Sequence, residues 1–150
     1  MFEGKTWWIT GASSGIGAAL ARALADKGAK LILSGRNEAA LKDVAAQVTT
    51  ESLLLPFEAT DFAKLPEIVA KAWDWGPVHG LVNNAGISQR SLAVDTDFEV
   101  FERIIGVDLM APIALTQLVL PRMIAGGGGR IVAISSVAGI IGAPLRAAYS

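Results

Sequence analysis

The sequence lacks the residues on which several protein classes depend. It has no cysteine and a single histidine, His79, among its 150 residues. Disulfide and thiol chemistry is therefore excluded, and a metal site built from His and Cys ligands is not expected. The absence of cysteine fits a reducing compartment, so we expect a cytoplasmic protein.

Charge is sparse and balanced. Only 18% of the residues are charged, and the formal net charge is −1. Because no polybasic patch is present, neither nucleic acid nor an anionic membrane is an expected partner. The apolar runs are short and broken by Gly, Pro or charged residues, so we expect no membrane span. The first residues lack the apolar stretch and cleavage site of a signal peptide.

What the chain does contain is a regular alternation of apolar segments. Hydrophobic residues make up 52% of the sequence, a share typical of strands buried on both faces. Strands are expected at residues 6–10, 30–34, 52–56, 78–82 and 130–135, and helices at 16–27, 38–48, 62–73 and 97–125, the last broken near Pro112. This order predicts right-handed βαβ units, and hence an α/β fold whose parallel sheet carries helices on both faces.

Ligands of such sheets bind beyond the carboxyl ends of the strands. A glycine-rich segment, TGASSGIG, follows the first expected strand and opens the first helix. Free N–H groups and the dipole at a helix start favour a pyrophosphate. The candidate binding residues are Gly11, Ser13, Ser14, Gly15, Ile16 and Gly17. The alternative is a plain tight strand–helix turn.

Arg36 follows the second expected strand, where an NAD site normally carries Asp or Glu. No acid stands there. A guanidinium suits the 2′-phosphate of NADP, so NADP(H) is expected in preference to NAD(H). The alternative is a solvated arginine at a helix start.

Two further segments follow strands. After the third, Glu58 and Ala59 either flank an adenine ring or merely precede Asp61, which would cap the next helix. After the fourth comes NNAG, residues 83–86, whose amides can tie loops together. We expect one asparagine to serve the architecture and Asn84, Ala85 and Gly86 to border a ligand. The alternative is a local Asx-turn.

Together these segments resemble the short-chain dehydrogenase/reductase family. The matching motifs are TGxxxGIG at residues 10–17, NNAG at 83–86, and an ISS…Y block that contains Ser136 and Tyr149. The resemblance runs along the whole chain. It implies a doubly wound, Rossmann-type sheet of order 3-2-1-4-5 and a reversible NAD(P)-dependent oxidation of alcohols or reduction of carbonyls.

The resemblance also implies roles for three residues. Tyr149 would be the general acid–base, and Ser136 would hydrogen-bond and polarise the substrate carbonyl. The family's catalytic asparagine falls at Asp108, within VDL, residues 107–109. A carboxylate there keeps an acceptor oxygen but loses the amide donors, which leaves its side-chain role open.

The family pattern continues past residue 150. Its lysine, four residues beyond the tyrosine, would fall at position 153. We therefore expect residues 1–150 to be the dinucleotide-binding, N-terminal part of a longer single-domain enzyme, inactive alone and lacking the family's C-terminal strands. Family members commonly pair through the helix near residues 112–125, so a homodimer or homotetramer is expected.

Two other functions stay open. One is a non-catalytic NADP(H)-binding sensor or scaffold, which the aspartate at position 108 favours. The other is a nucleotide-sugar epimerase or dehydratase, which the glycine spacing and the missing acid after the second strand disfavour. A small carbonyl or alcohol compound remains the expected partner.

Overall fold

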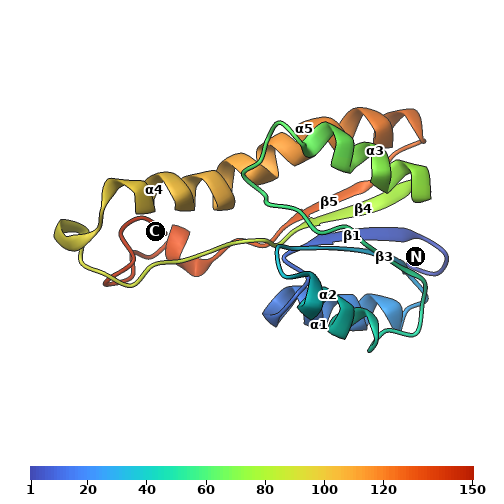
Figure 1. The fold of residues 1–150 in the computed structure, drawn as a ribbon, viewed down its shortest axis with the longest axis horizontal. Helices are drawn as coiled ribbons and strands as arrows, with labels where there is room; N and C mark the ends of the chain where they lie inside the picture. The colour runs from blue at the N-terminus through green and yellow to red at the C-terminus, as the bar shows by residue number, and fades with distance from the viewer.

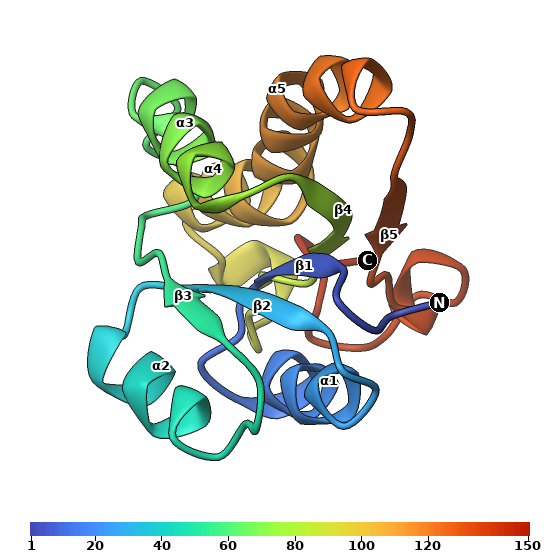
Figure 2. The same ribbon diagram turned by 90° about the vertical axis from the view of Figure 1, so that its right-hand side faces the viewer.

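A single parallel sheet organises the computed structural model, which describes all of residues 1–150. Its order is β3-β2-β1-β4-β5 (Figures 1 and 2). The strands are β1 (Thr6–Thr10), β2 (Lys30–Ser34), β3 (Ser52–Leu54), β4 (Val78–Asn83) and β5 (Arg130–Ala133). The predicted α/β fold, its parallel pairing and its strand order are confirmed.

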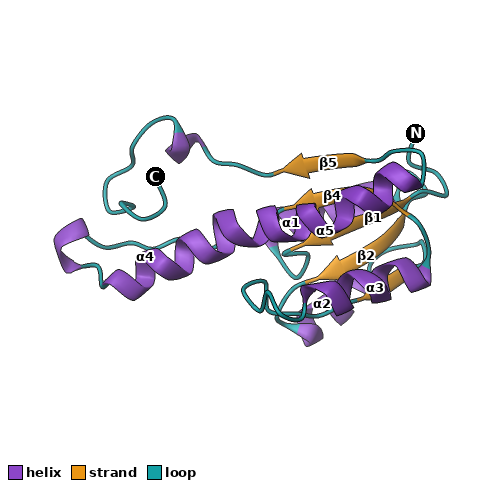
Figure 3. Cartoon of the chain, turned by 90° about the horizontal axis from the view of Figure 1, so that it is seen from above, coloured by secondary structure: helices purple, strands orange, loops and turns teal.

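The helices cover both faces of the sheet. On one face lie α1 (Gly15–Ala25) and α2 (Glu38–Ala45), and on the other lie α3 (Leu65–Trp75) and α5 (Ala111–Ala125) (Figure 2). Helix α4 (Phe98–Ile105) extends past the carboxyl ends of the strands (Figure 3). A π-helical turn, η2 (Gly106–Met110), joins it to α5. Two short 3₁₀ turns, η1 (Ala93–Asp95) and η3 (Val137–Gly139), complete the elements.

Strand β1 lies at the centre of the core. Trp7 and Ile9 pack in the cluster that contains α1 and α2, whereas Trp8 faces the cluster that contains α3 and α5. This alternation is what a strand buried on both faces requires. Gly80 of the neighbouring β4 leaves room for the Trp7 ring, since a Cβ there would come within 2.4 Å of it.

The buried face of α1 differs from the expected one. The helical spacing of Ile16, Leu20, Ala23 and Leu24 in the sequence predicts one buried face. In the structure Ile16 and Ala23 are exposed, and Leu20 and Leu24 are half-buried. The buried residues are Gly17, Ala18, Ala21 and Ala25. Small side chains let the helix axis approach the sheet closely, and this packing outweighs the larger apolar residues.

The long helical region is interrupted near Pro112, as predicted, because a π-helical turn separates α4 from α5. Pro112 lies just after this turn, η2, and its missing N–H leaves one hydrogen bond of the helix unmade there. The helix from Phe98 to Ala125 is 28 residues long, with a hydropathy of 1.7 over its most apolar window. By length and composition it could cross a membrane, so the expectation that no segment could do so was wrong. Only 28% of that window is buried, and α5 packs against the sheet through Leu115 and Val119.

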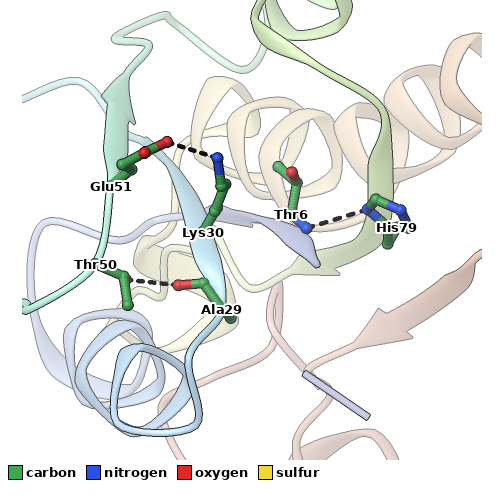
Figure 4. Close-up of polar contacts among 6 residues, drawn as sticks. All are labelled: Thr6, Ala29, Lys30, Thr50, Glu51 and His79. Atoms are coloured by element: carbon green, nitrogen blue, oxygen red, sulfur yellow. Dashed lines mark hydrogen bonds and ion pairs between the residues drawn. The ribbon is translucent and has the colours of Figure 1, made fainter. Parts of the chain in front are cut away.

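Polar contacts tie the amino ends of the strands together (Figure 4). The Thr6 N–H donates to His79 Nδ1 at 3.1 Å, and the Thr50 hydroxyl donates to the Ala29 carbonyl at 2.6 Å. Lys30 pairs with Glu51 at 2.7 Å. The candidate ligand-binding residues all lie at the opposite end of the sheet.

Candidate functional site

The loops that leave β1 to β4 enclose a cavity of about 390 Å³ at the carboxyl end of the sheet. We call it the glycine-turn cavity. Its lining includes eleven of the twelve predicted cofactor-binding residues: Gly11, Ser13, Ser14, Gly15, Ile16, Arg36, Glu58, Ala59, Asn84, Ala85 and Gly86. Gly17 is the exception, because it is buried beneath the turn. The structure therefore brings together four loops that are distant in the sequence.

The glycines of the turn are required by its geometry. Gly11 has a φ of +64°, and a Cβ on it would lie 2.7 Å from the Ala85 Cα. A Cβ on Gly17 would lie 2.2 Å from the Gly11 carbonyl oxygen. The Ser14 side chain does not cap α1, so the first helical N–H groups stay available to an anion. The turn fits the diphosphate of a dinucleotide.

Arg36 and Glu58 form the wall of this cavity beyond β2 and β3. The Arg36 Nη1 and Glu58 Oε2 atoms lie 3.7 Å apart. One of the two expectations was that Asp61 caps the next helix, and this is wrong. Asp61 pairs with Lys64 at 2.7 Å, while α3 begins at Leu65 without a side-chain cap.

Asn83, the last residue of β4, and Asn84, which follows it, both serve the architecture. Asn84 Nδ2 donates to the carbonyls of Thr10 and Gly11, at 3.0 and 3.2 Å. Asn83 Nδ2 donates to the Thr116 hydroxyl of α5 at 3.1 Å. These contacts join distant segments, so the alternative of a local Asx-turn is wrong. Asn84 borders the cavity as well as bracing it.

Thr10 is a structural residue that the sequence analysis missed. Its hydroxyl accepts hydrogen bonds from the N–H groups of Asn84 and Ala85, both at 3.0 Å, and donates to the Val82 carbonyl. It thereby locks the end of β1 to the loop after β4. In the sequence Thr10 opens the TGxxxGIG motif, but no local pattern shows what its hydroxyl contacts.

A second cavity, of about 680 Å³, adjoins the first and is lined by Ser136, Tyr149 and Asp108. We call it the tyrosine cavity. The two cavities share the lining residues Ile16, Asn84, Ala85, Gly86 and Ile87. The candidate catalytic residues therefore line a cavity next to that of the glycine-rich turn.

The hydroxyl of Ser136 accepts a hydrogen bond from the backbone, which leaves its own proton able to be donated. Its Oγ accepts a hydrogen bond from the Ala138 N–H at 3.2 Å, at the start of η3. An oxygen that accepts from the backbone can still donate its own proton to a ligand in the cavity.

Tyr149 is supported by Arg146, which the sequence analysis did not identify. The guanidinium lies 5.9 Å from the centre of the Tyr149 ring, within cation–π range. Arg146 Nη1 also donates to the hydroxyl of Ser88, and the Ser91 N–H donates to the Leu145 carbonyl at 3.0 Å. These contacts tie the turn that carries Tyr149 to the loop after β4.

Asp108 faces the same loop from η2. Its Oδ1 accepts a hydrogen bond from the Ile87 N–H at 2.8 Å. Burial raises the pKa of this carboxyl, and the hydrogen bond from Ile87 offsets only part of the increase. The side chain therefore supports the wall shared by the two cavities.

Proteins of one known family match this chain in sequence. The sequence model of the short chain dehydrogenase family matches residues 5–150. The chain is 39% identical to human dehydrogenase/reductase SDR family member 7, over 95% of this chain and 44% of that protein. It is 35% identical to the ketoacyl reductase HetN of Nostoc, over 98% of this chain and 53% of HetN. The chain thus spans about half the length of these curated relatives.

A solved structure has the same fold as this chain. The crystal structure of a candidate short-chain alcohol dehydrogenase from Sinorhizobium meliloti superposes with a TM-score of 0.94 at 27% identity. The match covers 99% of this chain and 60% of that one. From the family match, the shared fold and the cavities at the carboxyl ends of the strands, we conclude that the chain belongs to the short-chain dehydrogenase/reductase family of oxidoreductases, whose cofactor is NAD(P).

Proposed function

We propose that the protein transfers a hydride between NADP(H) and an alcohol or carbonyl compound. The observation that supports this most is the wall shared by the glycine-turn cavity and the tyrosine cavity. A dinucleotide bound to the first cavity and extended across Gly86 and Ile87 would bring its reactive end to the second.

The residues of the glycine-turn cavity suit NADP(H). The N–H groups at the start of α1 would hold the diphosphate, and Arg36 would hold the 2′-phosphate. Glu58 and Ala59 would border the adenine. When bound, the nicotinamide supplies or accepts the hydride.

The side chains of the tyrosine cavity would hydrogen-bond the substrate oxygen and transfer a proton to it. In the reduction direction, the Ser136 hydroxyl donates a hydrogen bond to the carbonyl oxygen and polarises the C=O bond. When the carbonyl is reduced, the Tyr149 hydroxyl would give its proton to that oxygen, so that an alcohol results. In the oxidation direction, Tyr149 takes the proton back.

We assign Asp108 a positioning role. Its carboxylate oxygen receives the Ile87 N–H, and Ile87 borders both cavities. The side chain thus fixes the wall along which the cofactor would lie, without contacting the reacting atoms.

The substrate class follows from the other residues of the tyrosine cavity. Leu109, Ile113 and Ile134 give it an apolar side. We therefore propose a carbonyl or secondary alcohol that carries an apolar substituent.

The test is turnover of NADPH with a panel of aldehydes and ketones of increasing apolar size. We expect activity in the full-length protein. Tyr149→Phe and Ser136→Ala should each lower kcat at least about 100-fold, while the dissociation constant for NADPH stays within about twofold. If NADPH binds but no carbonyl is reduced and Tyr149→Phe changes nothing, the protein is a cofactor-binding sensor or scaffold instead.

We also propose that the protein forms a homodimer or homotetramer through α4, η2 and α5. Outside the tyrosine cavity, these helices expose the large apolar side chains Phe98, Ile105, Met110, Leu120 and Ile124. Such a patch is typical of an interface. Sedimentation of the detergent-free protein should give a dimer or tetramer. A species that stays soluble only in detergent would instead indicate that the helix enters a membrane.

A further inference from the structure

The ion pair between Arg36 and Glu58 places a negative charge beside the expected 2′-phosphate site. The two side chains come from the segments after β2 and β3 and line the same cavity. Their charged atoms lie 3.7 Å apart, too far for a hydrogen bond. The pair therefore interacts by charge, and Glu58 does not fix the orientation of the guanidinium.

Glu58 is itself held in place by its neighbour Thr60. Glu58 Oε1 accepts from the Thr60 hydroxyl at 3.3 Å and from the Thr60 N–H at 3.5 Å. With one oxygen held this way, the other stays directed towards Arg36. The carboxylate therefore lies at the cavity wall near Arg36.

We propose that Glu58 is a specificity-determining residue whose carboxylate weakens binding of the 2′-phosphate and so limits the preference for NADP(H) over NAD(H). This inference rests on the proposed function, in which Arg36 receives that phosphate. A phosphate monoester carries a charge of about −1.5 to −2 at neutral pH. In this protein the 2′-phosphate would bind to an arginine that has the carboxylate of Glu58 beside it. Without Glu58, the positive charge of Arg36 would be unopposed and would attract the phosphate more strongly.

The effect of Glu58 on the binding constant should be small, because both charged side chains are exposed to water. The side chains of Arg36 and Glu58 are 57% and 44% exposed, so water and salt screen their charges. Exposed charge interactions of this kind correspond to about a two- to fivefold change in a binding constant. NAD(H) carries a hydroxyl in place of the phosphate, so its binding should barely depend on the charge of Glu58.

The experiment measures dissociation constants by calorimetry for NADP⁺, NAD⁺, 2′-AMP and 5′-AMP with the wild-type protein and Glu58→Gln. The amide keeps the size of the side chain and an acceptor for Thr60, but removes the charge. We expect Glu58→Gln to bind NADP⁺ and 2′-AMP about two- to fivefold more tightly, with NAD⁺ and 5′-AMP unchanged. The gain should shrink at high salt.

Glu51→Gln is the matched control. Glu51 is also an exposed carboxylate in an ion pair, with Lys30, but it lies at the amino end of the sheet (Figure 4). This variant should bind all four nucleotides as the wild type does.

Two results would overturn the inference while leaving the proposed function intact. An equal change for NADP⁺ and NAD⁺ would mean that Glu58 acts on the shared adenine or ribose. Weaker binding of NADP⁺ by Glu58→Gln would mean that the carboxylate orients Arg36 for the phosphate. Failure of the wild-type protein to bind any of the nucleotides would overturn the proposed function and the inference with it.

Discussion

At the scale of single residues, Asp108 makes a favourable hydrogen bond, but burial of its charge is unfavourable. Its acceptor oxygen holds the Ile87 N–H in the wall between the cavities. Burial of the same carboxyl makes its ionised form costly, and its pKa rises accordingly. An amide at this position would supply the acceptor without the charge.

Asp108→Asn should therefore be more stable than the wild type at neutral pH. A carboxyl with a raised pKa binds its proton more tightly in the folded state, so the folded protein gains stability as the pH falls and loses it as the pH rises. The advantage of the variant should accordingly disappear as the pH falls through the raised pKa. Chemical unfolding at several pH values checks this. The exposed Asp74→Asn serves as the control, and an unchanged or lower stability of Asp108→Asn at neutral pH would contradict the expectation.

The location of a residue was predictable where its place after a strand decides it, although this does not test its role. Arg36, Glu58 and Asn84 each follow a strand, and parallel strands carry their following loops to one edge of the sheet. Thr10 and Arg146 could not be found this way. Their importance lies in contacts with Asn84 and Ser88, which are 74 and 58 residues away, and no local pattern encodes those.

At the scale of elements, the two ends of the sheet have different tasks. The carboxyl ends carry the loops of both cavities, whereas the amino ends are tied by contacts such as that between Thr6 and His79 (Figure 4). His79 accepts the Thr6 N–H through Nδ1, which requires the neutral ring. Burial lowers the pKa of His79, the charge of Lys5 lowers it further, and a hydrogen bond to the Pro77 backbone opposes both.

Acid should therefore loosen this end of the sheet. A histidine whose pKa is lowered in the folded state gives its full stability above its ordinary pKa of about 6.5. That contribution is lost as the pH falls below this value, because the unfolded chain then binds the proton more readily. His79→Asn keeps an acceptor oxygen but cannot titrate, so its stability should fall less than that of the wild type over the same range. Parallel unfolding curves for the two proteins at every pH would refute this.

The elements themselves were predictable where burial is uniform. Strands β1 and β2 have the bounds that the sequence predicted, residues 6–10 and 30–34. The face of α1 was misjudged because Ile16 is needed at the cavities and small residues are needed against the sheet. The π-helical turn η2 was missed because it keeps the apolar composition of the helices on either side.

At the scale of the whole molecule, the sheet is asymmetric. One side of β5 pairs with β4, and its other side is an edge (Figure 2). All four of its residues are exposed, and Ile131 and Val132 are each 38% exposed. An exposed edge of β-branched residues favours pairing with another chain.

The 150-residue chain expressed on its own should therefore associate through β5. We expect light scattering to increase with concentration, and Ile131→Lys to reduce it because a charge on an edge strand opposes pairing. Leu120→Lys, on the exposed side of α5, separates this association from any through the helices. A monomeric wild-type chain of 150 residues would rule out the edge as the cause.

The strand order 3-2-1-4-5 was predicted from the family motifs together with the alternation of strands and helices, and the fold bears it out. The cavities were not predictable as shapes, because they arise from four loops and the turn before Tyr149 that meet only in the folded chain.

The central claim is that the glycine-rich turn and Tyr149 serve one and the same cofactor. A crystal structure of the full-length protein with bound NADP⁺ tests it most directly. We expect the diphosphate at the start of α1, the 2′-phosphate at Arg36, and the nicotinamide in the tyrosine cavity facing the Tyr149 hydroxyl. A dinucleotide that binds elsewhere, or whose nicotinamide points away from Tyr149 and Ser136, would contradict the account.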